Sequence, residues 1–296
     1  MNASSRSRAW AVVVESTIAF ALTLVLALHT GDTRAASVAM ATDVQGKVST
    51  SAGGAKRDVE ILSEIADGAQ VELAPSAQLV AVYLKSGEEF TLSGPAVARF
   101  TEAAPQSISG AVPVRRASAL EKGKGVRIRP VGVAQAAVVM RGRPSARIKL
   151  LSLADTRTLD ARPEFRWQAL AGAKSYHFNL NDPTGRTVLE FDVEGDSYKL
   201  PASVRLEEGA NYSWDLSARL GDGRRYSANG AFSVLSAGQR QEVEALRPSA
   251  AAPLAERVAF AAWLEEQELR DEAHKYWKAA ASERPQDQRL KQLAGE

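Results

Sequence analysis

The chain shows two patterns of apolar and polar positions after an apolar N-terminal segment. From Asp43 to about Phe100, and again from Ile148 to Leu235, short apolar and β-branched stretches are separated by glycine-containing turns, which is typical of β-strands. After Ser236 the residues become helix formers with apolar positions three and four apart. We therefore predict a mainly β fold, with two β domains followed by a small α-helical hairpin.

The N-terminal segment predicts export. Arg6 and Arg8 precede an apolar run from Trp10 to Leu28, interrupted by Glu15, and small residues follow it. The preferred cleavage sequence is Ala39-Met40-Ala41, with Thr33-Arg34-Ala35 as an earlier candidate. We expect residues 1–41 to be a signal peptide and the protein to be periplasmic. The alternative is an uncleaved signal anchor that holds it at the inner membrane.

The first β domain is predicted over residues 42–142. Val44-Gln45-Gly46-Lys47-Val48 opens it, Ile65-x-x-Gly68-Ala69-x-Val71 follows, and Lys85-x-Gly87-x-x-Phe90-x-Leu92 leads to Gly94-Pro95. These motifs resemble the periplasmic FecR domain. The resemblance covers roughly residues 42–101 and implies a small β-solenoid or sandwich-like module.

The best-known proteins with this domain relay an outer-membrane signal to a cytoplasmic sigma factor. Here too few residues precede Trp10 to fold, so we expect no cytoplasmic effector domain. The resemblance therefore implies only the extracytoplasmic module, used as a building block of the cell envelope.

The second β domain is predicted over residues 148–236 as a seven-stranded antiparallel sandwich. Large residues alternate along its strands, and its motifs include Arg162-Pro163-Glu164-Phe165-Arg166-Trp167 and Leu206-x-x-Gly209-x-x-Tyr212-x-Trp214. They resemble fibronectin type III-like or Ig-like modules of bacterial envelope proteins. We expect the core to contain Trp167, Trp214, Tyr176 and Tyr212, the alternative being a carbohydrate platform.

His177 neighbours Tyr176 and should therefore point outward. With no second histidine and no carboxylate pattern near it in the sequence, it is not expected to bind a metal ion.

The C-terminal part, residues 239–296, is predicted to form a helical hairpin. Leu254, Val258, Ala261 and Leu264 make one stripe and Ala273, Trp277 and Ala280 the facing one, with the turn at Leu269-Arg270-Asp271. The spacing from Leu254 to Asp287 resembles one tetratricopeptide motif. A single repeat cannot bury both of its faces, so it must dock on something.

Two aromatic residues of the first helix lie off this stripe. At 100° per residue Trp263 points away from Ala261, and Phe260 lies between Trp263 and the stripe. Both need a cover. We expect Phe260 and Trp263 either to bind a protein partner or to pack on the protein's own β domain, and the sequence favours neither alternative.

Charge is balanced overall, with 37 basic and 35 acidic residues, but the segment from Val114 to Lys149 is basic. It suggests an anionic partner, such as an envelope polymer, bound by Arg115, Arg116, Arg127, Arg129, Arg141 and Arg143. The alternative is that these side chains keep strand edges soluble. The segment contains no aromatic residues, so binding of nucleic acid by base stacking is not expected.

Composition argues against catalysis. The chain has no cysteine and three histidines, which excludes thiol chemistry and leaves few metal ligands. No zinc-protease, serine-hydrolase or phosphate-loop motif is present. We therefore expect no enzymatic activity and no cofactor. The preferred function is an exported envelope adaptor or scaffold that binds a protein partner, and the alternative is binding of cell-wall glycan or lipopolysaccharide.

Overall fold

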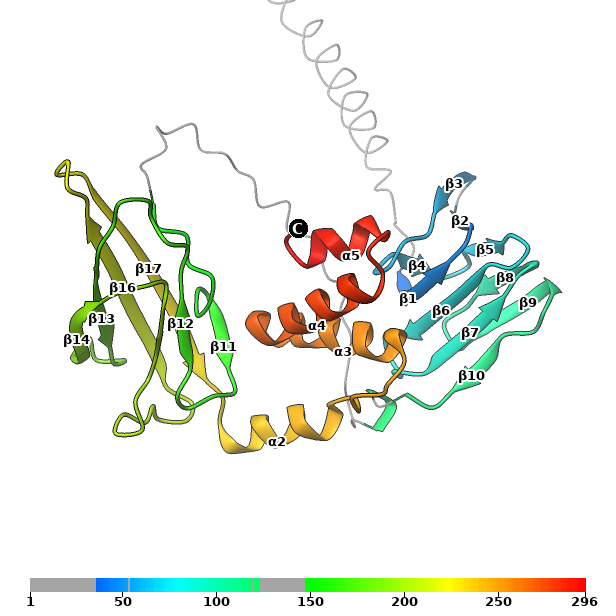
Figure 1. Cartoon of the computed structure of the whole chain (residues 1–296). Coiled ribbons are helices and arrows are strands. Elements are labelled where there is room, and N and C mark those ends of the chain that lie inside the picture. Colours follow the sequence, from blue (N-terminus) through cyan, green and yellow to red (C-terminus); the bar gives the residue numbers. More distant parts are fainter. Residues whose placement is uncertain (1–35, 53, 119, 123–146) are drawn as a thin grey trace, which may run out of the picture. The chain divides into compact units, whose positions relative to one another are not determined.

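The computed structural model describes residues 36–52, 54–118, 120–122 and 147–296. Residues 1–35 of the predicted signal peptide lie outside these ranges, as do Arg127, Arg129, Arg141 and Arg143. Within them, no helix has the length and apolar character needed to cross a membrane. The fold is mainly β, as predicted, with helices gathered at the C-terminus (Figure 1).

The N-terminal β domain contains two five-stranded sheets within the described residues. Their orders are β10-β7-β6-β1-β4 and β3-β2-β5-β8-β9, with antiparallel neighbours throughout. The strands are β1 (Ser37–Gln45), β2 (Val48–Ala52), β3 (Ala55–Asp58), β4 (Glu64–Ala66), β5 (Gln70–Leu73), β6 (Gln78–Tyr83), β7 (Glu89–Ser93), β8 (Ala96–Phe100), β9 (Pro105–Gly110) and β10 (Val114–Arg116). A short 3₁₀ helix, η2 (Leu120–Lys122), follows.

The sheet that contains β1 and β6 is buried on both faces. Ala39 and Ala41 belong to the core between the two sheets, whereas Met40, which points the other way, belongs to a cluster with the C-terminal helices. On β6, Ala81 likewise belongs to the core between the two sheets, and Val82 belongs to the cluster with the C-terminal helices. The helices therefore complete the N-terminal domain as a further layer over this sheet.

The predicted boundary between residues 41 and 42 falls inside β1, so the β domain begins earlier than predicted. The strand begins at Ser37, and Ala39, Met40 and Ala41 are each 0% exposed. Cleavage after Ala41 would remove half of a central strand. The earlier candidate, Thr33-Arg34-Ala35, would leave β1 whole.

The second β domain is a seven-stranded sandwich, as predicted, but it is not antiparallel throughout, because β11 and β17 pair in parallel. Five strands form one sheet, in the order β11-β17-β16-β13-β14, and two form the other, β12-β15. The strands are β11 (Thr156–Thr158), β12 (Glu164–Arg166), β13 (Tyr176–Asn181), β14 (Thr187–Val193), β15 (Ser197–Lys199), β16 (Asn211–Arg219) and β17 (Arg225–Val234). Along β16 exposed and buried residues alternate without interruption, as a half-buried strand requires.

The core of this sandwich contains the predicted aromatic residues. Trp167 and Trp214 are 0% exposed, and Tyr176 and Tyr212 are 2% and 6% exposed. The indole of Trp214 lies over Gly230, where an added Cβ would come within 2.4 Å of its Nε1. A side chain at position 230 would therefore displace this tryptophan.

Four helices end the chain: α2 (Ala237–Leu246), α3 (Leu254–Glu266), α4 (Arg270–Glu283) and α5 (Gln288–Leu293). Ser236 caps α2 through a capping box with Gln239. The hairpin of α3 and α4 begins at Leu254 as predicted, but α4 already starts at Arg270, so the turn lies earlier than expected. Leu290 of α5 is buried in the same core, and α5 thus covers one side of the hairpin.

Candidate functional site

The helix α3 is buried nearly all round, because it packs between α4 and the N-terminal β domain. Nine of its 13 residues are buried, including both aromatic residues that lie off the predicted stripe. They share one cluster with residues of the β domain: Met40, Ile61, Leu62, Val82, Leu84 and Leu120. This surface joins parts of the same chain.

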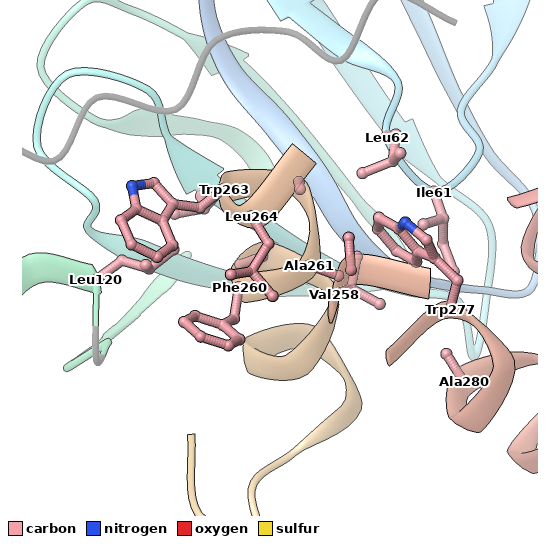
Figure 2. Packing of buried hydrophobic residues seen from close by; sticks show 14 of the residues in the cluster. Ile61, Leu62, Leu120, Val258, Phe260, Ala261, Trp263, Leu264, Trp277 and Ala280 are labelled. Atoms are coloured by element: carbon pink, nitrogen blue, oxygen red, sulfur yellow. The ribbon is translucent and has the colours of Figure 1, made fainter. Parts of the chain in front are cut away.

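Phe260 and Trp263 are 1% and 3% exposed. Their rings stack with 5.7 Å between centroids, and Phe260 meets the ring of Tyr276 on α4 edge to face at 5.1 Å. Figure 2 shows side chains of this cluster from both parts, with Leu120, Ile61 and Leu62 from the β domain and Trp263 and Trp277 from the helices. Of the two predicted covers, the structure therefore shows the intramolecular one. A partner could reach these rings only after the helices had left the β domain.

Charged side chains border this apolar interface. Arg284, just after α4, pairs with Asp43 on β1 through both terminal guanidinium nitrogens: Nη1 donates to Oδ1, and Nη2 donates to Oδ2 at 2.9 Å. Glu89 on β7 is 8% exposed, and burial, followed by repulsion from Glu256, raises its pKa. The interface thus gains one ion pair and contains one carboxylate that is unfavourable when charged.

The turn between α3 and α4, together with the first residues of α4, is hydrogen-bonded to the sandwich. Oδ2 of Asp271 accepts the backbone N–H of Leu153 at 2.8 Å, and the backbone N–H of Arg157 donates to the carbonyl of Glu268 at 2.8 Å. Oγ1 of Thr156 donates to the same carbonyl at 2.9 Å and accepts the N–H of Arg270 at 3.1 Å. We call residues 153–157 and 267–271 together the clasp.

The clasp is polar and its backbone is strained. Leu153, Asp155 and Glu268 have φ values of 55°, 51° and 61°, in the left-handed region that non-glycine residues rarely adopt. Burial raises the pKa of Asp271, which the N–H of Leu153 partly offsets. The helices therefore meet the two β domains differently, through apolar packing on one and hydrogen bonds on the other.

An open hollow of about 320 Å³ adjoins the clasp. Its walls come from β11, the ends of β16 and β17, and the turn before α4, and they carry Asp155, Arg157, Glu268 and Arg270. Basic and acidic side chains are equal in number there. The hollow thus shows no preference for an anion or a cation.

The sequence did not reveal these clasp residues. Asp271 and Leu153 are 118 positions apart, and the predicted hairpin turn that contains Asp271 gave no reason to expect Leu153 beside it. The only signal was the acidic residue in the first turn of a helix, which ordinarily indicates favourable interaction with the helix dipole.

Of the predicted anion-binding residues, the structure describes Arg115 and Arg116 on β10. Arg115 pairs with two carboxylates, Glu88 at 2.7 Å and Glu121. The pairing with Glu88 was not visible from the sequence, because β10 meets β7 only in the folded sheet. Arg115 therefore offers less positive charge to an anion than its position in a basic segment suggested.

His177 points outward as predicted, but carboxylates lie beside it. Its Nδ1 is 3.0 Å from Oδ1 of Asp192, and its Nε2 is 3.1 Å from Oε1 of Glu190, both on the neighbouring strand β14. The hydrogen bond with Asp192 is the main reason that the pKa of His177 is raised. The two carboxylates contact opposite ring nitrogens, and within the described ranges no group of three or more histidine, aspartate or glutamate side chains is arranged so that it could hold a metal ion.

No protein-family model matches the chain, and no curated protein matches it. Among solved structures, CopC from Methylosinus trichosporium OB3b is 19% identical, with a TM-score of 0.24, over 30% of this chain and 95% of that chain. A two-domain fibronectin type III segment of chicken tenascin is 10% identical, with a TM-score of 0.23, over 68% and 95% of the two chains. These are distant likenesses to β-sandwich proteins and concern the fold alone.

Proposed function

We propose that this protein is a non-catalytic, exported adaptor or scaffold of the cell envelope. In this proposal residues 37–122 are a FecR-like module, and the tetratricopeptide-like helices connect it to the fibronectin type III-like sandwich. The observation that carries the proposal is the double use of the hairpin, which shares an apolar core with one β domain and is hydrogen-bonded to the other. A connector of this kind has a structural role.

The proposal assigns partner binding to the β domains. The helical side chains that could have anchored a partner, Phe260 and Trp263, are used inside the protein. The aromatic residues that could have stacked on sugars, such as Trp167 and Trp214, fill the sandwich core. Buried rings offer no platform to a glycan, which favours a protein partner over a wall polymer.

The test compares protein and polymer partners. The full-length protein, expressed in its own cells, is crosslinked in the intact envelope, and the purified chain is separately sedimented with peptidoglycan and lipopolysaccharide. The adaptor proposal expects a defined protein adduct and a chain that stays in the supernatant. Sedimentation with either polymer, reversed by high salt and without a protein adduct, would instead support the glycan alternative.

A further inference from the structure

The strand β14 is the longest strand at an end of any described sheet. It has seven residues, compared with six in β9, four in β3 and three in the remaining end strands. Because β14 ends its sheet, every second N–H and C=O along its outer edge has no strand partner within the described ranges. Such an edge can accept a further strand.

The other end strands carry features that discourage pairing. Proline begins β9 and glycine ends it, β3 contains Lys56 and Arg57, and arginine or lysine occurs in β10, β11, β12 and β15. The strand β4 has three residues. By contrast, the β14 sequence Thr-Val-Leu-Glu-Phe-Asp-Val has no proline, glycine, lysine or arginine. Its pairing with β13 is irregular only near the turn, between Leu180 and Asn181.

The sandwich core is partly open along this edge. Leu189, Phe191 and Val193 point inward but remain half-buried, and the ring of Phe191 lies 4.5 Å from that of Tyr198 on β15. Since β15 belongs to the opposite, two-stranded sheet, an apolar seam runs between the two sheets here. Apolar side chains of an added strand would cover this seam and bury its half-exposed rings.

The outward side of β14 is acidic. The side chains of Glu190 and Asp192 are 54% and 72% exposed, although both touch His177. Val188, beside them on the same face, is 36% exposed. An added strand would therefore find carboxylates on one of its faces and apolar side chains on the other.

We propose that β14 binds an extended segment of a partner protein in which basic and apolar side chains alternate. The segment would lengthen the five-stranded sheet, placing its basic residues beside Glu190 and Asp192 and its apolar residues over Phe191. This inference rests on the adaptor proposal and specifies where and how the partner binds. Backbone hydrogen bonds supply much of the affinity, and the alternation supplies the specificity.

The probe is a labelled peptide of alternating arginine and valine, as long as β14, titrated into the full chain by fluorescence anisotropy. Two control peptides have the same length: one groups the arginines before the valines, and one replaces arginine with glutamate. We expect binding of the alternating basic peptide alone. In Glu190→Lys the affinity should fall at least about tenfold, and amides of residues 187–193 should gain hydrogen-exchange protection in the wild-type complex.

A matched variant, Glu164→Lys, makes the same charge change at an exposed residue of the short strand β12 and should bind like wild type. Equal binding of alternating and grouped peptides, or protection gained elsewhere, would overturn the proposal. A dimer of the free chain that Glu190→Lys dissociates would show that a second copy occupies the edge. Slow hydrogen exchange at β14 in a monomeric chain without peptide would show that another segment of the same chain already occupies the edge.

Failure of this proposal is distinguishable from failure of the adaptor function. If a protein adduct forms in cells and Glu190→Lys does not lower its yield, the adaptor function is supported and the β14 site is refuted. If no protein adduct forms in cells while the peptide still binds β14, the binding site is supported and the adaptor function is refuted.

Discussion

The guanidinium of Arg284 forms a bidentate ion pair with the carboxylate of Asp43, which lies 241 positions earlier in the chain. The pair ties the end of α4 to a central strand of the N-terminal sheet, with the Asp43 and Arg284 side chains only 12% and 25% exposed. Because the contact is bidentate and both side chains are largely buried, removing one partner would leave the other charge without compensation.

Asp43→Asn should therefore lower the free energy of unfolding by about 1–3 kcal/mol, because it leaves a largely buried arginine without its counter-charge. Urea denaturation measures the change. The exposed pair of Lys85 and Glu102, at 75% and 68% exposure, is the control, and Lys85→Met should change stability by less than about 0.5 kcal/mol. Equal effects of the two substitutions would contradict the importance of the buried pair.

Trp263→Ala tests whether the hairpin is part of the protein's own core. It removes a large side chain that is 3% exposed, so the unfolding free energy should fall by about 3–5 kcal/mol. A thermal melt of the purified chain measures this. An unchanged melting temperature would mean that the ring contributes nothing to the fold and is available to a partner.

Trp214 and Trp167 should respond differently to the same substitution. Nε1 of Trp214 donates to the carbonyl of Leu153 at 2.8 Å, whereas Nε1 of Trp167 has no hydrogen-bond partner. Trp214→Phe leaves that carbonyl unpaired, and Trp167→Phe removes an unsatisfied donor. We expect the first to cost about 1–3 kcal/mol more than the second, as measured by chemical denaturation. The reverse order would refute the assigned bond.

Glu89→Gln should stabilise the protein at neutral pH. Burial raises the pKa of Glu89 above its usual 4.5, so the folded state takes up a proton before the unfolded state as the pH falls. As the pH falls through the raised pKa, the unfolding free energy of the wild type therefore rises relative to that of the variant. This change ends at about pH 4.5, where the unfolded state is protonated as well. Denaturation curves from pH 8 to pH 4.5 measure the difference, and a variant less stable than wild type at pH 8 would contradict it. The exposed Glu164→Gln is the control for losing one charge.

The sandwich was predictable because its strands obey one simple rule. Tyr212, Trp214 and Leu216 alternate with polar residues, so the buried face can be read directly from the sequence. The helical cover of the N-terminal domain was harder to foresee. The run from Leu79 to Tyr83 lacks alternation, which indicates a strand buried on both faces, but it does not say what covers the second face.

The contacts that join the modules could not be predicted. Phe260 and Trp263 required a cover by their helical position, yet the same pattern fits a partner or an intramolecular surface. Asp271 and Leu153 are brought together only by the fold, and the carboxylates beside His177 come from a neighbouring strand whose register the sequence does not state. Cross-strand and inter-domain pairs depend on which elements become neighbours in three dimensions.

The central claim is that the C-terminal helices and the N-terminal β domain form one core. Hydrogen exchange of Trp263→Ala under native conditions tests it most directly. We predict faster exchange in β1 and β6 as well as in α3 and α4, with little change in β16, because the lost packing is shared by the first four elements and not by β16. Faster exchange confined to residues 254–283 would contradict the claim.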